Sequence, residues 1–220
     1  MAKGLARRLL RWAEEEGRTF AWRSEHDAFR ILLAEILLQR SRSSTVEKVY
    51  VELTQRWEGP SSLADAGIEE IASVIRPLGL TSRAPRIKEL AQAVSQRGKM
   101  PTRARELREL PGVGGYVASA TAAALGRADL PLVDSVSARV FLRYFHGSSE
   151  PTPSDAAAMA YASVARKRWH RLNWATLDLA AAICLPKRPQ CGRCPLAKGC
   201  AWHVAQSATD GAWAGNTALV

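Results

Sequence analysis

The chain has 220 residues and carries 31 Lys and Arg against 21 Asp and Glu, which gives a formal net charge of +10. With 47% hydrophobic residues it can form one large domain or two small lobes around a packed core. No apolar run approaches the roughly 20 residues of a membrane span, so we expect no membrane partner. The charge favours a polyanionic partner such as nucleic acid, since neutralising phosphates releases counterions, although simple solubility would also explain it.

The N-terminal stretch MAKGLARRLLRWAEEEG has the pattern of an amphipathic helix broken by charge, and it does not resemble a signal peptide. We therefore expect a cytoplasmic protein that is nucleoid-associated through its nucleic acid partner. In that compartment cysteines do not form disulfides by default.

The hydrophobic pattern is helical along nearly all of the chain. AFRILLAEILLQ (28–39) is apolar on most faces, which predicts a buried central helix with Asp27 as its N-cap. Ser44 and Glu47 form a Ser-x-x-Glu capping box for the helix that follows. No segment of alternating polarity is long enough to predict a strand, so the expected fold class is all-α. Further helices are predicted at 61–66, 68–76, 83–97, 103–109, 115–126, 135–145, 154–165 and 172–183.

Two C-terminal segments have no assigned role in the site. RKRWHR (166–171) is the densest basic run, and it is either a phosphate-facing surface or a solvated helix end. The tail 205–220 is small and polar without periodicity, and we expect it to be disordered.

A glycine-rich connection, LRELPGVGGY, separates two of the predicted helices. Pro111 ends the first helix, and Gly112, Gly114 and Gly115 permit positive φ and close backbone approach. The first amides of the second helix lack partners and form an anion site. Val113 can pack between the two helices. An ordinary helix–helix turn is the alternative interpretation.

All four cysteines lie within 17 residues, in the spacing C-x6-C-x2-C-x5-C. Structural zinc usually takes two close pairs of cysteines some distance apart, and only one close pair is present here. A short wrapping loop suits an iron–sulfur cubane, in which each iron takes one cysteine. Zinc remains the alternative, because both metals accept four thiolates. The cysteines are Cys184, Cys191, Cys194 and Cys200.

The hairpin, the positive charge and the cysteine spacing together resemble the helix-hairpin-helix DNA glycosylases that carry an iron–sulfur cluster, a superfamily that includes endonuclease III. The resemblance runs from about Phe20 to Cys200. AEILLQRSRSSTV, IRPLGLTSRAPRIKELA, LPGVGGY and LVDSVSARVFLRYFHG look closest to the thymine glycosylases that act on G·T mismatches, and next to the adenine glycosylases that act opposite 8-oxoguanine.

The resemblance implies an all-α fold of two helical lobes flanking a cleft. Residues 1–24 plus 131–204 would form the N/C-terminal lobe, with a [4Fe-4S] cluster bound by the four cysteines. Residues 25–130 would form a middle helical bundle that contains the hairpin at 103–126.

Three residues are implied as catalytic. The family places an aspartate 18 positions beyond the first residue of the second hairpin helix, and counting from Tyr116 gives Asp134. This carboxylate would stabilise the positive charge of an oxocarbenium-like transition state, and it is compatible with an N-cap at the helix that follows. Glu35, inside the apolar LLAEILL, matches a glutamate that protonates or contacts the departing base, with a snorkelling surface glutamate as the alternative.

Tyr116 stands where bifunctional relatives carry a lysine that attacks the sugar and leads to strand cleavage. Because tyrosine cannot form a Schiff base, its presence predicts a monofunctional enzyme that leaves an abasic site and an intact strand.

The resemblance also implies residues that contact DNA. Gln39 and Arg40 match the helix tip that fills the space vacated by an extruded base, although RSRSS (40–44) would equally suit a phosphate-contacting loop. Leu80 matches a loop that approaches the opposite strand. The hairpin residues that would grip one strand without reading bases are Leu110, Gly112, Val113, Gly114 and Gly115.

The leading hypothesis is a monomeric, monofunctional DNA glycosylase that acts on double-stranded DNA containing a mismatched or damaged base. It would flip the base into the cleft between Tyr116, Asp134 and Glu35, and thymine or uracil opposite guanine is the favoured substrate because weak pairing lowers the cost of flipping. One alternative is adenine opposite 8-oxoguanine, against which the absence of a further C-terminal domain argues. Another is a non-catalytic DNA-binding module, which the presence of both carboxylates disfavours. A third is a glycosylase for a normal base in a particular sequence context.

Overall fold

The computed structural model describes residues 2–147 and 155–206, and every regular element in those ranges is a helix. The predicted all-α fold class is therefore confirmed. Within the same ranges, no helix has both the length and the apolarity needed to cross a bilayer. The chain divides into two compact units, which we call the central unit (19–130) and the discontinuous unit (1–18 and 131–220) and describe separately.

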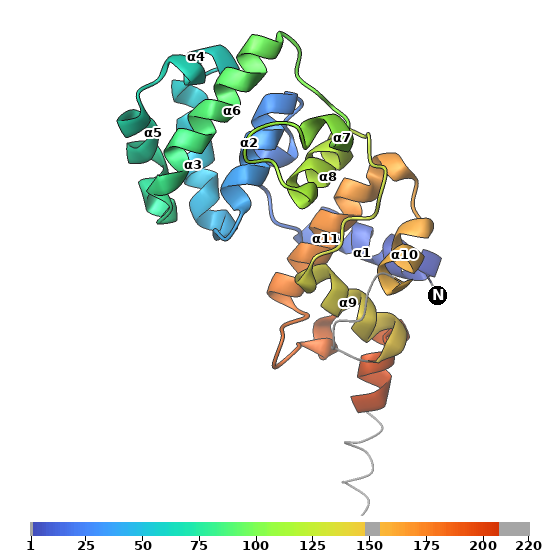
Figure 1. Ribbon diagram of the computed structural model, residues 1–220. Helices are drawn as coiled ribbons and strands as arrows, with labels where there is room; N and C mark the ends of the chain where they lie inside the picture. The colour runs from blue at the N-terminus through green and yellow to red at the C-terminus, as the bar shows by residue number, and fades with distance from the viewer. Residues whose placement is uncertain (1, 148–154, 207–220) are drawn as a thin grey trace, which may run out of the picture. The chain divides into compact units, whose positions relative to one another are not determined.

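The central unit is built around α2 (Ala28–Leu38), which packs between α3 (Ser43–Arg56) and α8 (Gly115–Ala124) (Figure 1). Seven of its eleven residues are buried, and the Asp27 carboxylate accepts a hydrogen bond from the Arg30 amide (2.9 Å), so both predictions for this helix are confirmed. The remaining elements are η1 (Ala21–Arg23), α4 (Pro60–Asp65), α5 (Ile68–Ile75), η2 (Arg76–Leu78), η3 (Thr81–Arg83), α6 (Ala84–Arg97) and α7 (Ala104–Leu107).

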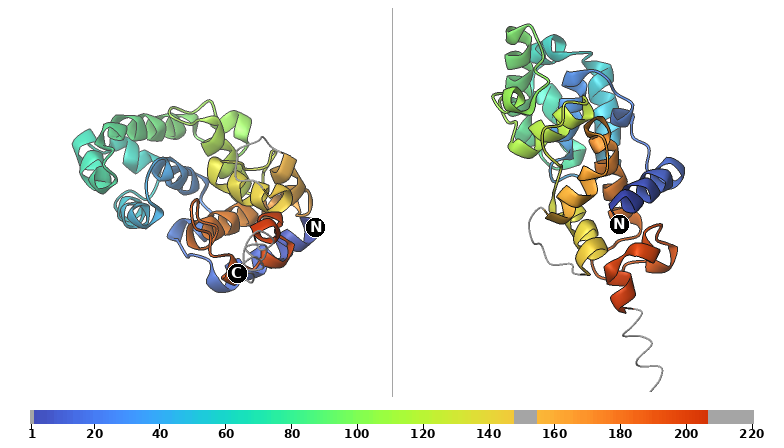
Figure 2. Two further views of the ribbon diagram at one scale, coloured as in Figure 1. Left: turned by 90° about the horizontal axis from the view of Figure 1, so that it is seen from below. Right: turned by 90° about the vertical axis from the view of Figure 1, so that its right-hand side faces the viewer.

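In the discontinuous unit, α1 (Ala2–Glu16) packs along α11 (Trp169–Ala182), and the two helices lie side by side in Figure 2. Both α1 and α9 (Ser135–His146) also pack against α10 (Asp155–Ala162). Tyr161 on α10 is fully buried and donates its hydroxyl to the Leu132 carbonyl (2.9 Å). The short elements are η4 (Arg166–Arg168), η5 (Cys191–Arg193) and η6 (Ala197–Gly199), and residues 201–206 are helical.

The predicted capping box at Ser44 and Glu47 is wrong. The helix begins at Ser43 after Arg42, whose side chain makes no capping hydrogen bond. The Glu47 carboxylate instead accepts hydrogen bonds from the Ala21 amide at 3.0 and 3.2 Å. Glu47 therefore makes a tertiary contact with Ala21 in place of the local capping hydrogen bond that the spacing predicts.

Two predicted boundaries also differ from the structure. Residues 19–24 belong to the central unit and not to the N/C-terminal lobe, because Trp22 is buried in its core and meets the Tyr50 ring edge-on (5.7 Å between centroids). Ala205 and Gln206 are helical, which corrects the start of the expected disordered tail. The rest of that tail, residues 207–220, lies outside the described residues.

The discontinuous unit contains an ion pair between Arg18 and the buried carboxylate of Asp178. Asp178 is 2% exposed and accepts hydrogen bonds from Arg18 Nε (2.7 Å) and from the Arg18 amide (3.0 Å). Because Arg18→Met removes the Nε hydrogen bond and the positive charge that face a buried carboxylate, we expect a loss of about 2–4 kcal/mol in the free energy of unfolding by urea.

The matched control is Arg97→Met, which breaks the exposed pair of Arg97 with Glu109 (3.1 Å). We expect that variant to lose less than about 1 kcal/mol. Equal losses in the two variants would contradict the assignment.

Candidate functional site

The hairpin between α7 and α8 is held by two apolar side chains and exposes its glycines. Leu110 and Val113 are 5% and 7% exposed, and Val113 lies in the core as predicted. Gly112 has a φ of +75°, and the Val113 amide closes the turn onto the Leu110 carbonyl (3.2 Å). Within the described part of the chain, the exposed amides of Gly114 and Gly115 donate no hydrogen bond to another backbone group.

Glycine at position 112 is required by space as well as by φ. A Cβ there would lie 2.6 Å from Cδ and 2.8 Å from Cγ of Arg86, which packs its aliphatic stem on the turn. Because Leu110 and Val113 are buried, a ligand at this turn would meet backbone amides and not their side chains.

Glu35 lies on α2 between buried neighbours and is itself half-buried. Burial raises the pKa of this carboxyl to about 7. A group with such a pKa can hold or release a proton near neutral pH, which is the property required of a general acid or base. Tyr116, the second residue of α8, lies in the same unit and has a side chain that is 40% exposed.

The end of α2 presents the predicted DNA-contacting residues Gln39 and Arg40, and both are exposed. Arg40 has a φ of 58° and is the one non-glycine residue in the described ranges with a positive φ. Leu80 is half-buried and directly precedes η3, where its carbonyl accepts from the Arg83 amide (2.9 Å).

Asp134 belongs to the discontinuous unit, where it is the N-cap of α9. Its Oδ1 accepts three hydrogen bonds, from the Val136 amide (2.9 Å), the Ser137 amide (2.7 Å) and Ser137 Oγ (2.9 Å). The Asp134 amide in turn donates to Ser137 Oγ (2.9 Å), which completes a capping box. The carboxylate orientation is therefore fixed through one oxygen, and Oδ2 takes part in none of these bonds.

The structure thus groups the predicted site residues by unit. The central unit holds Glu35, Tyr116, the α2 tip, Leu80 and the hairpin, and the discontinuous unit holds Asp134 and the four cysteines.

The four cysteines are free thiols on the loop after α11, and each is half-buried. Burial and, to a smaller extent, the charges of Cys184, Cys200 and Cys191 raise the pKa of Cys194 to about 11, so the other three cysteines lie within electrostatic reach of this thiol. In the described ranges no three His, Cys, Asp or Glu side chains stand in metal-binding geometry. The donor chemistry nevertheless fits a cluster that takes four thiolates.

Two arginines on α9 fasten this loop. Arg143 is 3% exposed and donates to the carbonyls of Leu185 (2.7 Å) and Pro186 (2.6 Å), and its Nη1 lies 3.5 Å from Cys184 Sγ. Arg139 donates twice to the Cys184 carbonyl, at 3.2 and 3.1 Å. Sequence reasoning missed both residues, although their four-residue spacing placed them on one helix face.

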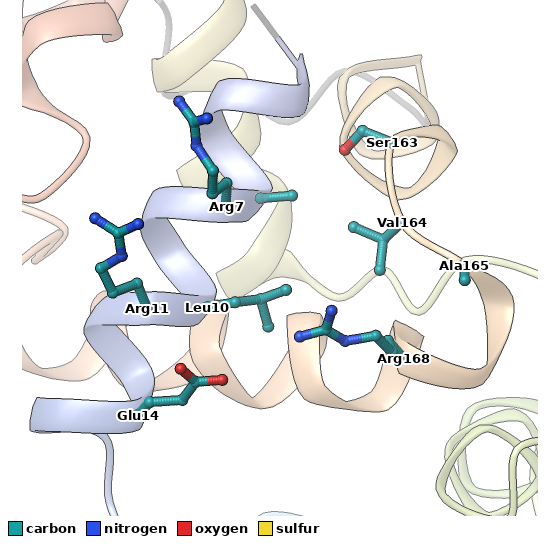
Figure 3. Close-up of a pocket in the computed structure, with 9 residues that line it drawn as sticks. Arg7, Leu10, Arg11, Glu14, Ser163, Val164, Ala165 and Arg168 are labelled. Atoms are coloured by element: carbon teal, nitrogen blue, oxygen red, sulfur yellow. The ribbon is translucent and has the colours of Figure 1, made fainter.

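The basic run 166–171 divides between the core and the surface. Trp169 is buried and donates from its indole to the Val164 carbonyl (2.9 Å), whereas Arg166 and Arg168 are exposed. Arg168 points toward Leu10 of α1 across a groove of about 380 Å³ (Figure 3). The run therefore leads into α11, with its tryptophan in the core and its arginines exposed.

Comparison with known proteins places the chain in a family. The model of the HhH-GPD superfamily base excision DNA repair proteins matches residues 33–165. The chain belongs to this superfamily. The match begins at Leu33 within α2 and contains Glu35, the hairpin and Asp134, whereas the four cysteines lie beyond it.

The HhH-GPD chain is similar to several curated proteins over most of its length. A thymine-DNA glycosylase of Aeropyrum pernix is 32% identical over 91% of this chain and 95% of its own. A thymine/uracil-DNA glycosylase of Pyrobaculum aerophilum is 34% identical over 86% of both chains. An adenine DNA glycosylase of Mycobacterium tuberculosis is 31% identical over 92% of this chain and 69% of its own.

Solved structures show the same fold. A thermostable thymine-DNA glycosylase superposes with a TM-score of 0.81 at 29% identity, covering 92% of this chain and 97% of its own. Endonuclease III in a non-covalent complex with DNA has a TM-score of 0.74 at 21% identity, covering 94% and 99%, which supports the fold alone.

Proposed function

We propose that this HhH-GPD protein is a DNA glycosylase that removes thymine or uracil opposite guanine, acting as a monomer on double-stranded DNA. The observation that carries the proposal is the similarity to thymine and thymine/uracil glycosylases along 86–95% of both chains. The exposed amides at the hairpin support it, because they suit a DNA phosphate and carry no base specificity.

In this proposal Asp134 is the catalytic carboxylate. Breaking the N-glycosidic bond builds positive charge on the sugar, and a pre-oriented carboxylate stabilises that charge. The capping bonds to Oδ1 hold the side chain in place, which leaves Oδ2 for the sugar or for the attacking water. The hydrogen bonds that make Asp134 the N-cap of α9 therefore also orient its carboxylate for catalysis.

Glu35 is proposed to act on the base. With a pKa near 7 it is partly protonated at neutral pH, and the protonated carboxyl can donate a hydrogen bond to a base oxygen as negative charge develops there.

Tyr116 supports hydrolysis without strand cleavage, because its side chain has no amine to form a Schiff base. The wild-type protein should give no covalent adduct with abasic DNA under borohydride. Tyr116→Lys should give one, because it supplies an amine at the partly exposed second residue of α8. A borohydride adduct with the wild-type chain would contradict the monofunctional assignment.

We further propose that the four cysteines hold a [4Fe-4S] cluster, which would fix the loop through four bonds at once. Arg139 and Arg143 would tie that loop to α9, the helix that Asp134 caps. Anaerobically purified protein should be brown and contain about four irons per chain, since each iron takes one cysteine.

Replacement of Cys194 by Ser should remove the colour, and it should destabilise the loop in proteolysis because one ligand is lost. Zinc bound stoichiometrically in a colourless preparation would contradict the cluster.

The deciding experiment offers the protein duplexes that carry G·T, G·U, A·8-oxoguanine or only normal pairs, followed by alkali to cut abasic sites. Release from G·T and G·U supports the proposal. Release of adenine alone would instead favour the hypothesis of an adenine glycosylase that acts opposite 8-oxoguanine. The similarity to the Mycobacterium tuberculosis enzyme supports this alternative. Release from a normal pair would indicate a context-specific enzyme, and binding without any release would indicate a non-catalytic module.

A further inference from the structure

The end of α2 is fastened by a side chain from a different part of the central unit. Arg83 donates from Nη1 to the Ile36 carbonyl (3.2 Å) and from Nη2 to the Gln39 carbonyl (2.7 Å). The Ile36 carbonyl also accepts from the Gln39 amide (3.3 Å), whereas the Gln39 carbonyl lies beyond the last helical turn. Carbonyls at a helix C-terminus lack helical partners, and a cation there is favoured by the helix dipole. The Arg83 guanidinium therefore caps the end of α2, although Arg83 is 47 residues away from Ile36 in the sequence.

The backbone just beyond this cap is in a conformation that arginine rarely adopts. Arg40 has a φ of 58°, and a non-glycine residue there persists only when surrounding contacts hold it. Two of those contacts meet at the Gln39 carbonyl, which accepts from Arg83 and from Ser41 Oγ (3.4 Å). The Ser41 amide also donates to the Leu38 carbonyl (3.2 Å). The shape of the tip therefore depends on Arg83.

Arg83 itself sits in a fixed place. It ends η3, its amide donates to the Leu80 carbonyl (2.9 Å), and its side chain is half-buried. With Ile36, Gln39 and Arg86 it lines a small cavity of about 30 Å³ that also borders Pro111 and Gly112 of the hairpin. The tip, the Leu80 loop and the hairpin turn thus adjoin one another within one unit.

We propose that Arg83 is a positioning residue whose guanidinium holds Gln39 and Arg40 in the shape that occupies the space left by an extruded base. This inference rests on the proposed function, because it assumes a base that leaves the duplex. The planar fork of arginine can reach two carbonyls at once, whereas lysine has a single nitrogen. Lysine at position 83 keeps the charge and loses the second bond, so Arg83→Lys separates positioning from attraction to DNA.

The first test needs no substrate. In the DNA-free protein, amide hydrogen exchange of residues 39–41 should be about tenfold faster in Arg83→Lys, because a lost carbonyl bond shifts the local opening equilibrium by about that factor. Arg76→Lys, at an exposed arginine of η2, is the matched control and should exchange like wild type. Unchanged exchange in Arg83→Lys would overturn the inference.

The second test measures function. Arg83→Lys should bind an undamaged duplex within about twofold of wild type, since the charge is retained, while its single-turnover rate of base release falls about tenfold. A merely structural defect would lower affinity and rate together. Equal loss of both, or loss of neither, would contradict a positioning role.

A double-mutant cycle tests whether Arg83 acts through the α2 tip, which consists of Gln39 and Arg40. Arg40→Gly removes the cost of positive φ, so in that background Arg83→Lys should slow base release by less than about threefold. The same tenfold loss in both backgrounds would show that Arg83 acts elsewhere. If wild type releases no base from any duplex, the proposed function fails, while the exchange experiment still decides whether Arg83 holds the tip.

Discussion

Asp134→Asn should lower the single-turnover rate of base release by about 10²–10³-fold while leaving affinity for the duplex within about twofold. The physical reason is that asparagine is neutral and cannot stabilise the positive charge that develops on the sugar. Asparagine is nevertheless a good N-cap, and its amide oxygen can accept the bonds that Oδ1 now receives from Val136 and Ser137. The variant should therefore stay folded, with a change in unfolding free energy below about 1 kcal/mol.

The matched control is Asp27→Asn, which makes the same chemical change at another helix N-cap, that of α2. It should keep the wild-type rate of base release, because Asp27 is assigned no part in the chemistry. Urea unfolding and single-turnover kinetics on both variants check the pair. An active Asp134→Asn protein, or equal loss of activity in both variants, would contradict the catalytic assignment.

Glu35→Gln should raise the free energy of unfolding by about 2–3 kcal/mol at about pH 8. Below about pH 4.5 it should leave the free energy of unfolding almost unchanged. Burial raises the pKa of Glu35 from 4.5 to about 7 in the folded state, so the folded protein binds this proton more tightly than the unfolded chain does. The folded state therefore loses stability as the pH rises from 4.5 through 7, and above that range it carries the full desolvation cost of the ionised Glu35 carboxylate. Glutamine does not ionise and avoids this cost.

Glu70→Gln is a control with the opposite sign. The hydrogen bond from the Gly67 amide (2.9 Å) lowers the pKa of Glu70, and Arg56 lowers it further. Its contribution is therefore present above its ordinary pKa and lost toward acid, so Glu70→Gln should slightly destabilise the protein at neutral pH. Urea unfolding across the pH range measures both variants. A Glu35→Gln effect that does not vary with pH would contradict the raised pKa.

The rate of base release should follow the same titration if Glu35 donates to the departing base. The wild-type rate should then fall as the pH rises through about 7, and Glu35→Gln should be slower with a flatter profile. A loss of activity together with a gain of stability is expected where a partly desolvated charge is retained for function.

Residues with local signals were predicted well from the sequence. The apolar run of α2, the glycines of the hairpin and the N-cap position of Asp134 each depend on a few neighbouring residues, and all three are present in the structure. Glu35 stands out in the sequence because a carboxylate inside an apolar run is unusual. In the structure, burial raises the pKa of this carboxyl to about 7.

Residues that act across the chain were missed or misread. Glu47 has the spacing of a capping box, yet it bonds to Ala21, 26 residues away. Arg83 reaches the Ile36 carbonyl 47 residues away, and Arg143 reaches the Leu185 carbonyl 42 residues away. Nothing in the immediate neighbourhood of these residues distinguishes them from the many other arginines and glutamates of a basic chain.

The sequence by itself determined the helices, the hairpin and the grouping of the four cysteines, because periodicity, backbone freedom and ligand spacing are local properties. The tertiary structure decided which unit residues 19–24 join, which carbonyls Arg83 and Arg143 bind, and how far the Glu35 carboxyl is removed from water. Those outcomes depend on packing between segments that are distant in the sequence. A tertiary hydrogen bond or a desolvation cost exists only after the two segments have packed together.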